Sequence, residues 1–96
     1  MQIRLSIQCA TIRKEIGWEG KSEEVIDVKG ETIGDFLKSV ETRTGQTLYD
    51  RYTSGDSGVS VIWHNLTHFV QKDELERKIN EGDKIVLLRR IPGGGG

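Results

Sequence analysis

The sequence predicts an α+β fold, in which a mixed β-sheet of four to five strands packs over one main helix. Three patterns support this prediction. Residues 3–9 alternate between apolar and polar side chains, residues 33–44 carry one apolar stripe at helical spacing, and residues 85–88 form a near-continuous apolar run. A length of 96 residues fits a single domain that can bury its own core.

The first two strands are expected at residues 3–9 and 24–28. The alternation in the first is typical of a half-buried strand, and the second is rich in β-branched side chains. Between them, residues 10–23 are mostly polar and contain Gly17 and Gly20, so we expect a turn or a wide hairpin loop there. The apolar side of the first strand consists of Ile3, Leu5, Ile7 and Cys9.

The main helix is expected to run from about residue 33 to 44. Thr32 is a candidate N-cap, and Asp35 follows three residues later as an acidic capping partner. Gly45 is a natural stop signal after the helix. The apolar stripe consists of Ile33, Phe36, Leu37 and Val40.

The second half of the chain is expected to complete the sheet. Its predicted elements are a mobile loop over 46–58, a strand over 59–63, a tight turn at His64 and Asn65, a short strand over 66–70, a helical turn or longer loop over 72–81 and a turn at 82–83. The run at 85–88 predicts a central strand that lies beside the first strand and parallel to it. This order of elements suggests a β-grasp.

Composition excludes several classes of function. Fourteen basic and 15 acidic residues give a net charge of −1, which offers no electrostatic reason for binding nucleic acid or an anionic membrane. Cys9 is the single cysteine, so an internal disulfide and a four-cysteine metal site are excluded. No apolar stretch is long enough to span a bilayer. We therefore expect a cytoplasmic domain without a membrane or nucleic-acid partner.

The glycine content is concentrated at the end of the chain. Four of the 12 glycines are Gly93–Gly96, and they follow Pro92, which cannot continue a hydrogen-bonded strand. We expect a folded domain over 1–91 and a flexible tail over 92–96, with an extended reach of roughly 17 Å. The tail's one reactive group is the α-carboxylate of Gly96, which needs activation, typically as an acyl-adenylate. A disordered end without a function is the alternative.

Residues 81–88 of the C-terminal segment read Glu-Gly-Asp-Lys-Ile-Val-Leu-Leu, and Arg-Arg-Ile-Pro and the glycines ending in Gly95-Gly96 follow. This segment resembles the C-terminus of the ubiquitin-like sulfur-carrier family. The family includes the small subunit of molybdopterin synthase, the thiamine-pathway sulfur carrier and carriers for cysteine synthesis and tRNA thiolation. The chain length and the presence of Pro92 favour the small subunit of molybdopterin synthase among these members. The usual pair of prolines and small spacer of that subunit appear here only as Ile91-Pro92 and two further glycines, which leaves the pathway open.

The resemblance implies a role for each part of the tail. Gly96 would carry the adenylate and then a thiocarboxylate, and Gly95 would leave the approach unhindered. The chain would act as a co-substrate without catalytic residues or bound cofactors of its own. An activating enzyme would use ATP and magnesium, a persulfide donor would supply sulfur, and the large subunit of a synthase would accept it. The partner-binding residues would be Val86, Leu88, Arg89, Arg90 and Ile91. The tail that leads to Gly96 would consist of Pro92, Gly93, Gly94 and Gly95.

Three alternatives stay open at this point. The same tail suits a ubiquitin-like modifier that is joined through Gly96 to a lysine of a target, or a β-grasp binding module with an incidental tail. Trimming of the tail before use is also open, because the chain has four terminal glycines where the chemistry needs two.

Other candidate sites are weaker. His64 and His68 lie four residues apart without a third ligand, so we expect exposed turn histidines and no metal site. Cys9 is expected to be a buried thiol. The outward face of the final strand would be covered either by residues 46–58 or by a partner, and the sequence does not decide on which face Trp63 and Phe69 lie.

Overall fold

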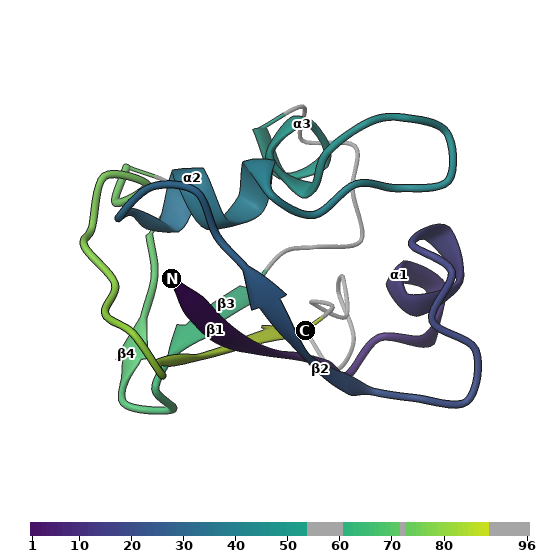
Figure 1. The fold of residues 1–96 in the computed structure, drawn as a ribbon, viewed down its shortest axis with the longest axis horizontal. Coiled ribbons are helices and arrows are strands. Elements are labelled where there is room, and N and C mark those ends of the chain that lie inside the picture. Colours follow the sequence, from purple (N-terminus) through teal and green to yellow (C-terminus); the bar gives the residue numbers. More distant parts are fainter. Residues whose placement is uncertain (54–60, 72, 89–96) are drawn as a thin grey trace, which may run out of the picture.

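The computed structural model describes residues 1–53, 61–71 and 73–88 (Figure 1). Within these residues, five strands form one mixed sheet in the order β2-β1-β5-β3-β4. The strands are β1 (Gln2–Ile7), β2 (Glu23–Asp27), β3 (Val61–His64), β4 (His68–Phe69) and β5 (Lys84–Leu88). The helices are α1 (Ala10–Glu15), α2 (Ile33–Lys38) and α3 (Leu48–Thr53).

Strand β5 occupies the centre of the sheet. It pairs parallel with β1, where Leu5 lies opposite Ile85, and antiparallel with β3, where Ile62 lies opposite Leu87. The parallel neighbour is the first strand, reached through the crossover that carries α2, so the predicted placement of the final strand is confirmed. The β1–β2 hairpin is antiparallel, as expected from its two strand patterns.

The core lies between one face of the sheet and α2. Figure 1 shows α2 and α3 on the same side of the sheet, with α1 beyond one end of β1. Alternate strand residues and the apolar stripe of α2 meet in this layer, which is why period-two and helical spacing coexist in one small chain. The side chains that are fully buried here include Ile3, Leu5, Ile7, Ile33, Phe36, Leu37, Ile62, Ile85 and Leu87.

A capping box starts α2, as predicted. The Thr32 hydroxyl accepts from the Asp35 N–H at 3.1 Å, and the Asp35 carboxylate accepts from the Thr32 N–H at 3.3 Å. The same carboxylate also accepts from the Glu31 N–H, and this bond is the main reason that the pKa of Asp35 lies below its ordinary value. Gly30 has a positive φ of 126°, and a Cβ there would collide with the Asp35 carboxylate. The box therefore needs glycine at this position.

The predicted end of this helix at residue 44 is wrong, because α2 ends at Lys38. The chain instead folds back on itself beyond the helix, where the Thr42 N–H donates to the Gln46 carbonyl at 2.6 Å and the Leu48 N–H to the Val40 carbonyl at 2.9 Å. Gly45, with a φ of 87°, forms the tip of this turn rather than a helix stop. These two turn hydrogen bonds outweigh the helical preference of the segment.

Two short helices replace parts of the predicted loops. Residues 10–15 form α1, because Ile12 is buried with Cys9 and Ile16 beside it at spacings of three and four residues. Gly17, with a φ of 82°, follows α1 instead of preventing it. In the second case, Leu48 and Tyr52 are both buried four residues apart on α3, so the mobile loop predicted over 46–58 is wrong for 48–53.

The remaining predictions from the second half are borne out in part. Strand β3 covers 61–63 of the strand predicted over 59–63, and residues 54–60 lie outside the described part of the chain. Asn65 does adopt the left-handed conformation, but the second turn residue is Leu66, and His64 belongs to the strand. In the described residues 73–81 the chain forms turns and no helix, which selects the longer loop.

Replacing Thr32 with Ala removes the acceptor for the Asp35 N–H. We expect this change to lower the free energy of unfolding by about 1 kcal/mol, measured by urea denaturation. Thr11→Ala is the matched control, since Thr11 is exposed on α1, and should change this free energy by less than about 0.5 kcal/mol. Equal effects of the two substitutions would contradict the capping role of Thr32.

Candidate functional site

The face of the sheet opposite α2, called here the outer face, carries a row of side chains from four neighbouring strands. Ser6 on β1 lies opposite Val86 on β5, Val86 lies opposite Trp63 on β3, and Trp63 lies opposite Phe69 on β4. Directly opposed residues point to the same face of a sheet. Since Leu5 and Ile85 face the core, this row faces outward, and Trp63 and Phe69 are thereby assigned to the outer face.

A groove of about 370 Å³ lies on the outer face. The outer-face groove is lined by Ser6, Gln8, Trp63, Leu66, Lys84, Val86 and Leu88. Trp63 and Phe69 stabilise one wall through an edge-to-face contact with ring centroids 5.8 Å apart. Leu66 and Phe69 are among the exposed large apolar side chains, with exposed fractions of 61% and 38%. The groove is therefore an apolar surface that is open to a partner.

The covering loop that the sequence allowed for this face is not found in the described residues. Leu48 and Tyr52 of α3 belong to the core on the α2 side of the sheet. The part of residues 46–58 that the structure describes thus packs away from the outer-face groove.

Polar groups occupy the β1 side of the groove. The Gln8 side-chain amide donates to the Ser6 hydroxyl at 2.9 Å, which satisfies a polar side chain that is itself buried. Lys84 Nζ lies 3.5 Å from the Glu23 carboxylate, and Arg4 Nε lies 3.9 Å from the same carboxylate. Two cations share one carboxylate, so this flank of the groove carries excess positive charge.

Val86 and Leu88 are the predicted partner-binding residues that the structure describes. Both line the outer-face groove, Val86 as a buried and Leu88 as a half-buried side chain. The other predicted site residues lie outside the described residues; they are Arg89, Arg90, Ile91, Pro92, Gly93, Gly94, Gly95 and Gly96. Leu88, a groove residue, is the last residue that the structure describes before this segment.

Sequence reasoning missed five groove residues: Ser6, Gln8, Trp63, Leu66 and Lys84. Ser6 and Gln8 could have been found, because they alternate with the apolar residues of β1 and must face outward. The face of Trp63 follows only from the β3–β5 register, which the sequence does not state.

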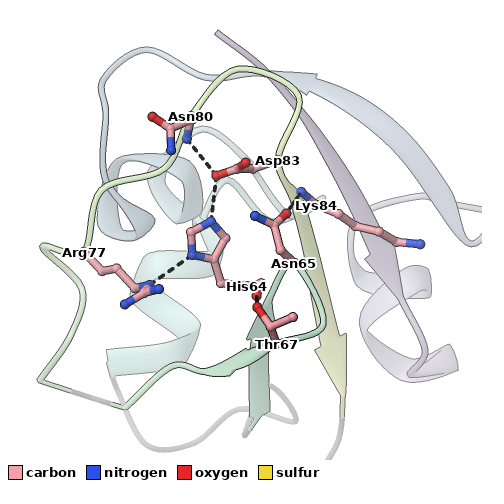
Figure 2. A network of polar contacts seen from close by, with 7 residues as sticks. All are labelled: His64, Asn65, Thr67, Arg77, Asn80, Asp83 and Lys84. Carbon is pink, nitrogen blue, oxygen red and sulfur yellow. Dashed lines mark hydrogen bonds and ion pairs between the residues drawn. The ribbon is translucent and has the colours of Figure 1, made fainter.

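A polar network fixes the other end of β5 (Figure 2). Asn65 binds the backbone of Lys84 twice: its N–H donates to the Lys84 carbonyl at 2.7 Å, and its side-chain oxygen accepts from the Lys84 N–H at 2.8 Å. Asn65 and Leu66 have φ values of 55° and 61°, the conformation of a tight hairpin turn. The turn between β3 and β4 therefore also holds the start of β5.

His64 belongs to this network and is buried, so the prediction of an exposed turn histidine is wrong for it. Its Nε2 lies 2.7 Å from the Asp83 carboxylate. Burial of Asp83 disfavours its charged form, but hydrogen bonds from His64, the Asn80 N–H and Asn65 outweigh that effect and hold the pKa of Asp83 below its ordinary value. His68, which is half-buried, contacts Glu74 instead.

The described residues contain neither a cluster of metal ligands nor a helix that could span a membrane. Across residues 1–53, 61–71 and 73–88, three or more His, Cys, Asp or Glu side chains nowhere gather as a metal site would require. In the same part of the chain, helices long and apolar enough to cross a membrane are absent. Cys9 is buried, as predicted, and packs in the core next to α1.

Comparisons with known proteins give a relative in sequence and a solved structure with a similar architecture. No protein-family model matches the chain. An uncharacterized protein of Archaeoglobus fulgidus is 23% identical over 94 residues, which cover 98% of this chain and 100% of that protein. The crystal structure of SAMP1 from Haloferax volcanii, a ubiquitin-like small archaeal modifier protein, matches with a TM-score of 0.58 and 18% identity, covering 98% of this chain and 100% of that chain.

The fold is a ubiquitin-like β-grasp. At this identity the likeness establishes the fold, and the function has to be argued from the site. In this β-grasp, the central strand starts at the Asn65 turn and ends beside an open apolar groove. Leu88, the last described residue of this strand, therefore lies at the outer-face groove.

The turn that holds β5 can be tested by two substitutions at one position. Asn65→Gly keeps the left-handed backbone accessible and removes the acceptor for the Lys84 N–H, so we expect a loss of about 1 kcal/mol in the free energy of unfolding. Asn65→Ala adds the strain of a positive φ, which should cost about 1 kcal/mol more. Urea denaturation measures both. An Ala variant as stable as the Gly variant would show that the backbone conformation contributes nothing.

Proposed function

We propose that the chain is a ubiquitin-like sulfur carrier whose Gly96 carboxylate is activated and converted to a thiocarboxylate. The observation that supports this proposal is the placement of β5. This central strand leads, within the β-grasp, from a fixed start at Lys84 to a half-buried Leu88 at the groove, and the segment ending in four glycines follows directly. A rigid strand would present such a tail to an enzyme at a defined position.

The proposed chemistry takes place in partner active sites. The Gly96 carboxylate attacks the α-phosphorus of ATP, held with magnesium by the activating enzyme, and pyrophosphate leaves. The terminal sulfur of a persulfide donor then attacks the acyl carbon and displaces AMP. A thiol reduces the resulting acyl disulfide, which leaves the thiocarboxylate. The chain supplies the carboxylate and binding surface, so it acts as a co-substrate and not as an enzyme.

The outer-face groove is the proposed docking surface for the activating enzyme and for the acceptor synthase. Trp63, Leu66 and Val86 provide an apolar surface for a partner side chain, and Lys84 adds positive charge at its flank. Arg89, Arg90 and Ile91 would extend this surface along the tail, where the guanidinium groups suit carboxylates or phosphates. An apolar centre with a charged flank is typical of a protein interface.

The proposed pathway is the synthesis of molybdopterin, the molybdenum or tungsten cofactor, with the large subunit of the synthase as sulfur acceptor. The support for this choice is the resemblance of residues 81–96 and of the chain length to the small subunit of molybdopterin synthase. Carriers for thiamine, cysteine or tRNA thiolation share the chemistry up to the thiocarboxylate, and they differ in the acceptor.

A second candidate is a protein modifier that is joined through Gly96 to lysines of target proteins. The structural likeness to SAMP1, a ubiquitin-like modifier protein, is compatible with this candidate. Both functions begin with the same adenylate and diverge at the nucleophile, which is sulfur in one case and an amine in the other. The product therefore distinguishes them.

Mass spectrometry of the intact protein, purified from its own cells, tests the proposal. We expect a fraction whose mass shows exchange of one oxygen for sulfur at the C-terminus, because the thiocarboxylate is the stored product. Deleting Gly96 is a poor test, since Gly94-Gly95 would still form a Gly-Gly terminus. The better control adds one Ala after Gly96, which should abolish the exchange. Conjugates that resist reducing agents, without any thiocarboxylate, would favour the modifier.

The docking surface can be tested by a matched pair of charged substitutions. Leu66 and Val25 are both exposed, at 61% and 51%, and Leu66 lines the outer-face groove while Val25 does not. We expect Leu66→Glu to slow thiocarboxylate formation about tenfold, because a partner would have to desolvate the carboxylate. Val25→Glu should change the rate less than about twofold. Similar rates for both variants would contradict docking at the groove.

A further inference from the structure

The histidines on either side of the β3–β4 turn both contact the segment that follows β4. Arg77 Nε donates to His64 Nδ1 at 3.0 Å (Figure 2), and Glu74 lies 3.0 Å from His68 Nε2. Glu74 and Arg77 are three residues apart, so residues 74–77 are attached to the hairpin by two different imidazoles. Neither contact belongs to the outer-face groove or to the proposed tail chemistry.

The contact with Arg77 fixes the protonation of His64. A guanidinium Nε–H can only donate, so Nδ1 of His64 must accept and carries no proton. Nε2 therefore carries the proton and donates it to the Asp83 carboxylate at 2.7 Å. The observed arrangement is compatible with a neutral imidazole in this one tautomer.

We propose that His64, Arg77 and Asp83 form a proton-sensitive latch, in which proton uptake by His64 expels the Arg77 side chain and loosens residues 75–79 from the hairpin. A proton from solvent on Nδ1 places two donors, and two positive charges, against each other at the position of the present 3.0 Å contact. The imidazolium stays in place, because Asp83 pairs with its other nitrogen. Arg77 is half-buried and is free to move toward solvent.

The contact with His68 responds in the opposite direction. An imidazolium at His68 strengthens the contact with the Glu74 carboxylate, which is ionised because its pKa lies below the ordinary value, chiefly through a hydrogen bond from the Gln71 N–H. Histidine is the side chain that changes charge between about pH 5 and 8. Proton uptake by the two imidazoles therefore releases the segment at Arg77 and holds it at Glu74.

Other charges around His64 do not replace these partners. Within the described part of the chain, Asp83 and Arg77 are the charged groups that contact its ring, and the positive charge of Arg77 also helps to lower the pKa of Glu74. Lys84, which is next to Asp83 in the chain, directs its ammonium to Glu23 on the outer face. Proton uptake thus acts on Arg77 and not on the groove.

Release of the Arg77 side chain affects α2, because the backbone of the same segment is hydrogen-bonded to the first turn of that helix. The Arg77 carbonyl accepts from the Ile33 N–H at 2.9 Å, and the Leu75 carbonyl accepts from the Gly34 N–H at 2.7 Å. These bonds satisfy N–H groups in the first turn of α2 that have no partner within the helix. Loosening of residues 75–79 therefore lowers the protection of the Ile33 and Gly34 amides from hydrogen exchange.

Nuclear magnetic resonance of the full chain tests the latch. The nitrogen shifts of His64 should show a proton on Nε2 and none on Nδ1 at a pH of about 8. On titration to a pH of about 5.5, the Arg77 Nε signal should move to the position of a solvent-exposed arginine as Nδ1 takes up a proton, and the exchange protection factors of Ile33 and Gly34 should fall several-fold.

Two variants separate the latch from general acid unfolding. Arg77→Met keeps the length of the side chain and removes the donors, so the protection factors of Ile33 and Gly34 should be low and independent of pH. His68→Gln should leave the response of Arg77 intact. A proton on Nδ1 of His64 at a pH of about 8, or an Arg77 signal that does not follow the His64 titration, would overturn the proposal.

Discussion

The position of β5 at the centre of the sheet is the constraint on which the rest of the structure depends. Its residues are apolar on both faces, and pairing with β1 and β3 places Ile85 and Leu87 in the core. Side chains alternate along a strand, so Val86 and Leu88 must then face outward. A shift of one residue would reverse both faces. The register that builds the core therefore also builds the outer-face groove.

The two ends of β5 are held by different forces. At its start, directional polar contacts from Asn65 and from the Asp83 turn fix the strand. At its end, burial of Leu87 and contacts with the neighbouring strands hold the backbone, and the Gln8 N–H donates to the Leu87 carbonyl at 2.9 Å. The strand is therefore held at both ends over its described length, Lys84–Leu88.

The sequence predicted the parts of the fold that rest on long, regular patterns. The alternation in β1, the capping box at Thr32 and the apolar run of β5 gave the β-grasp and the parallel neighbour of β5. The helices α1 and α3 bury one and two residues respectively, too few for a clear apolar period, whereas α2 buries four. His64 was misjudged because its partners Arg77 and Asp83 lie 13 and 19 residues away in the chain. Groove residues such as Trp63 likewise depend on register, a property of pairs of strands.

We infer that the carboxylate of Gly96 becomes activated while the β-grasp docks through the outer-face groove. ATP–pyrophosphate exchange by an adenylating enzyme from the source organism measures this activation most directly, because the exchange reports the reversible formation of the acyl-adenylate. We expect ATP–pyrophosphate exchange that requires the chain and that disappears when an added residue blocks the Gly96 carboxylate. Exchange that is equally fast with the blocked chain would contradict this inference.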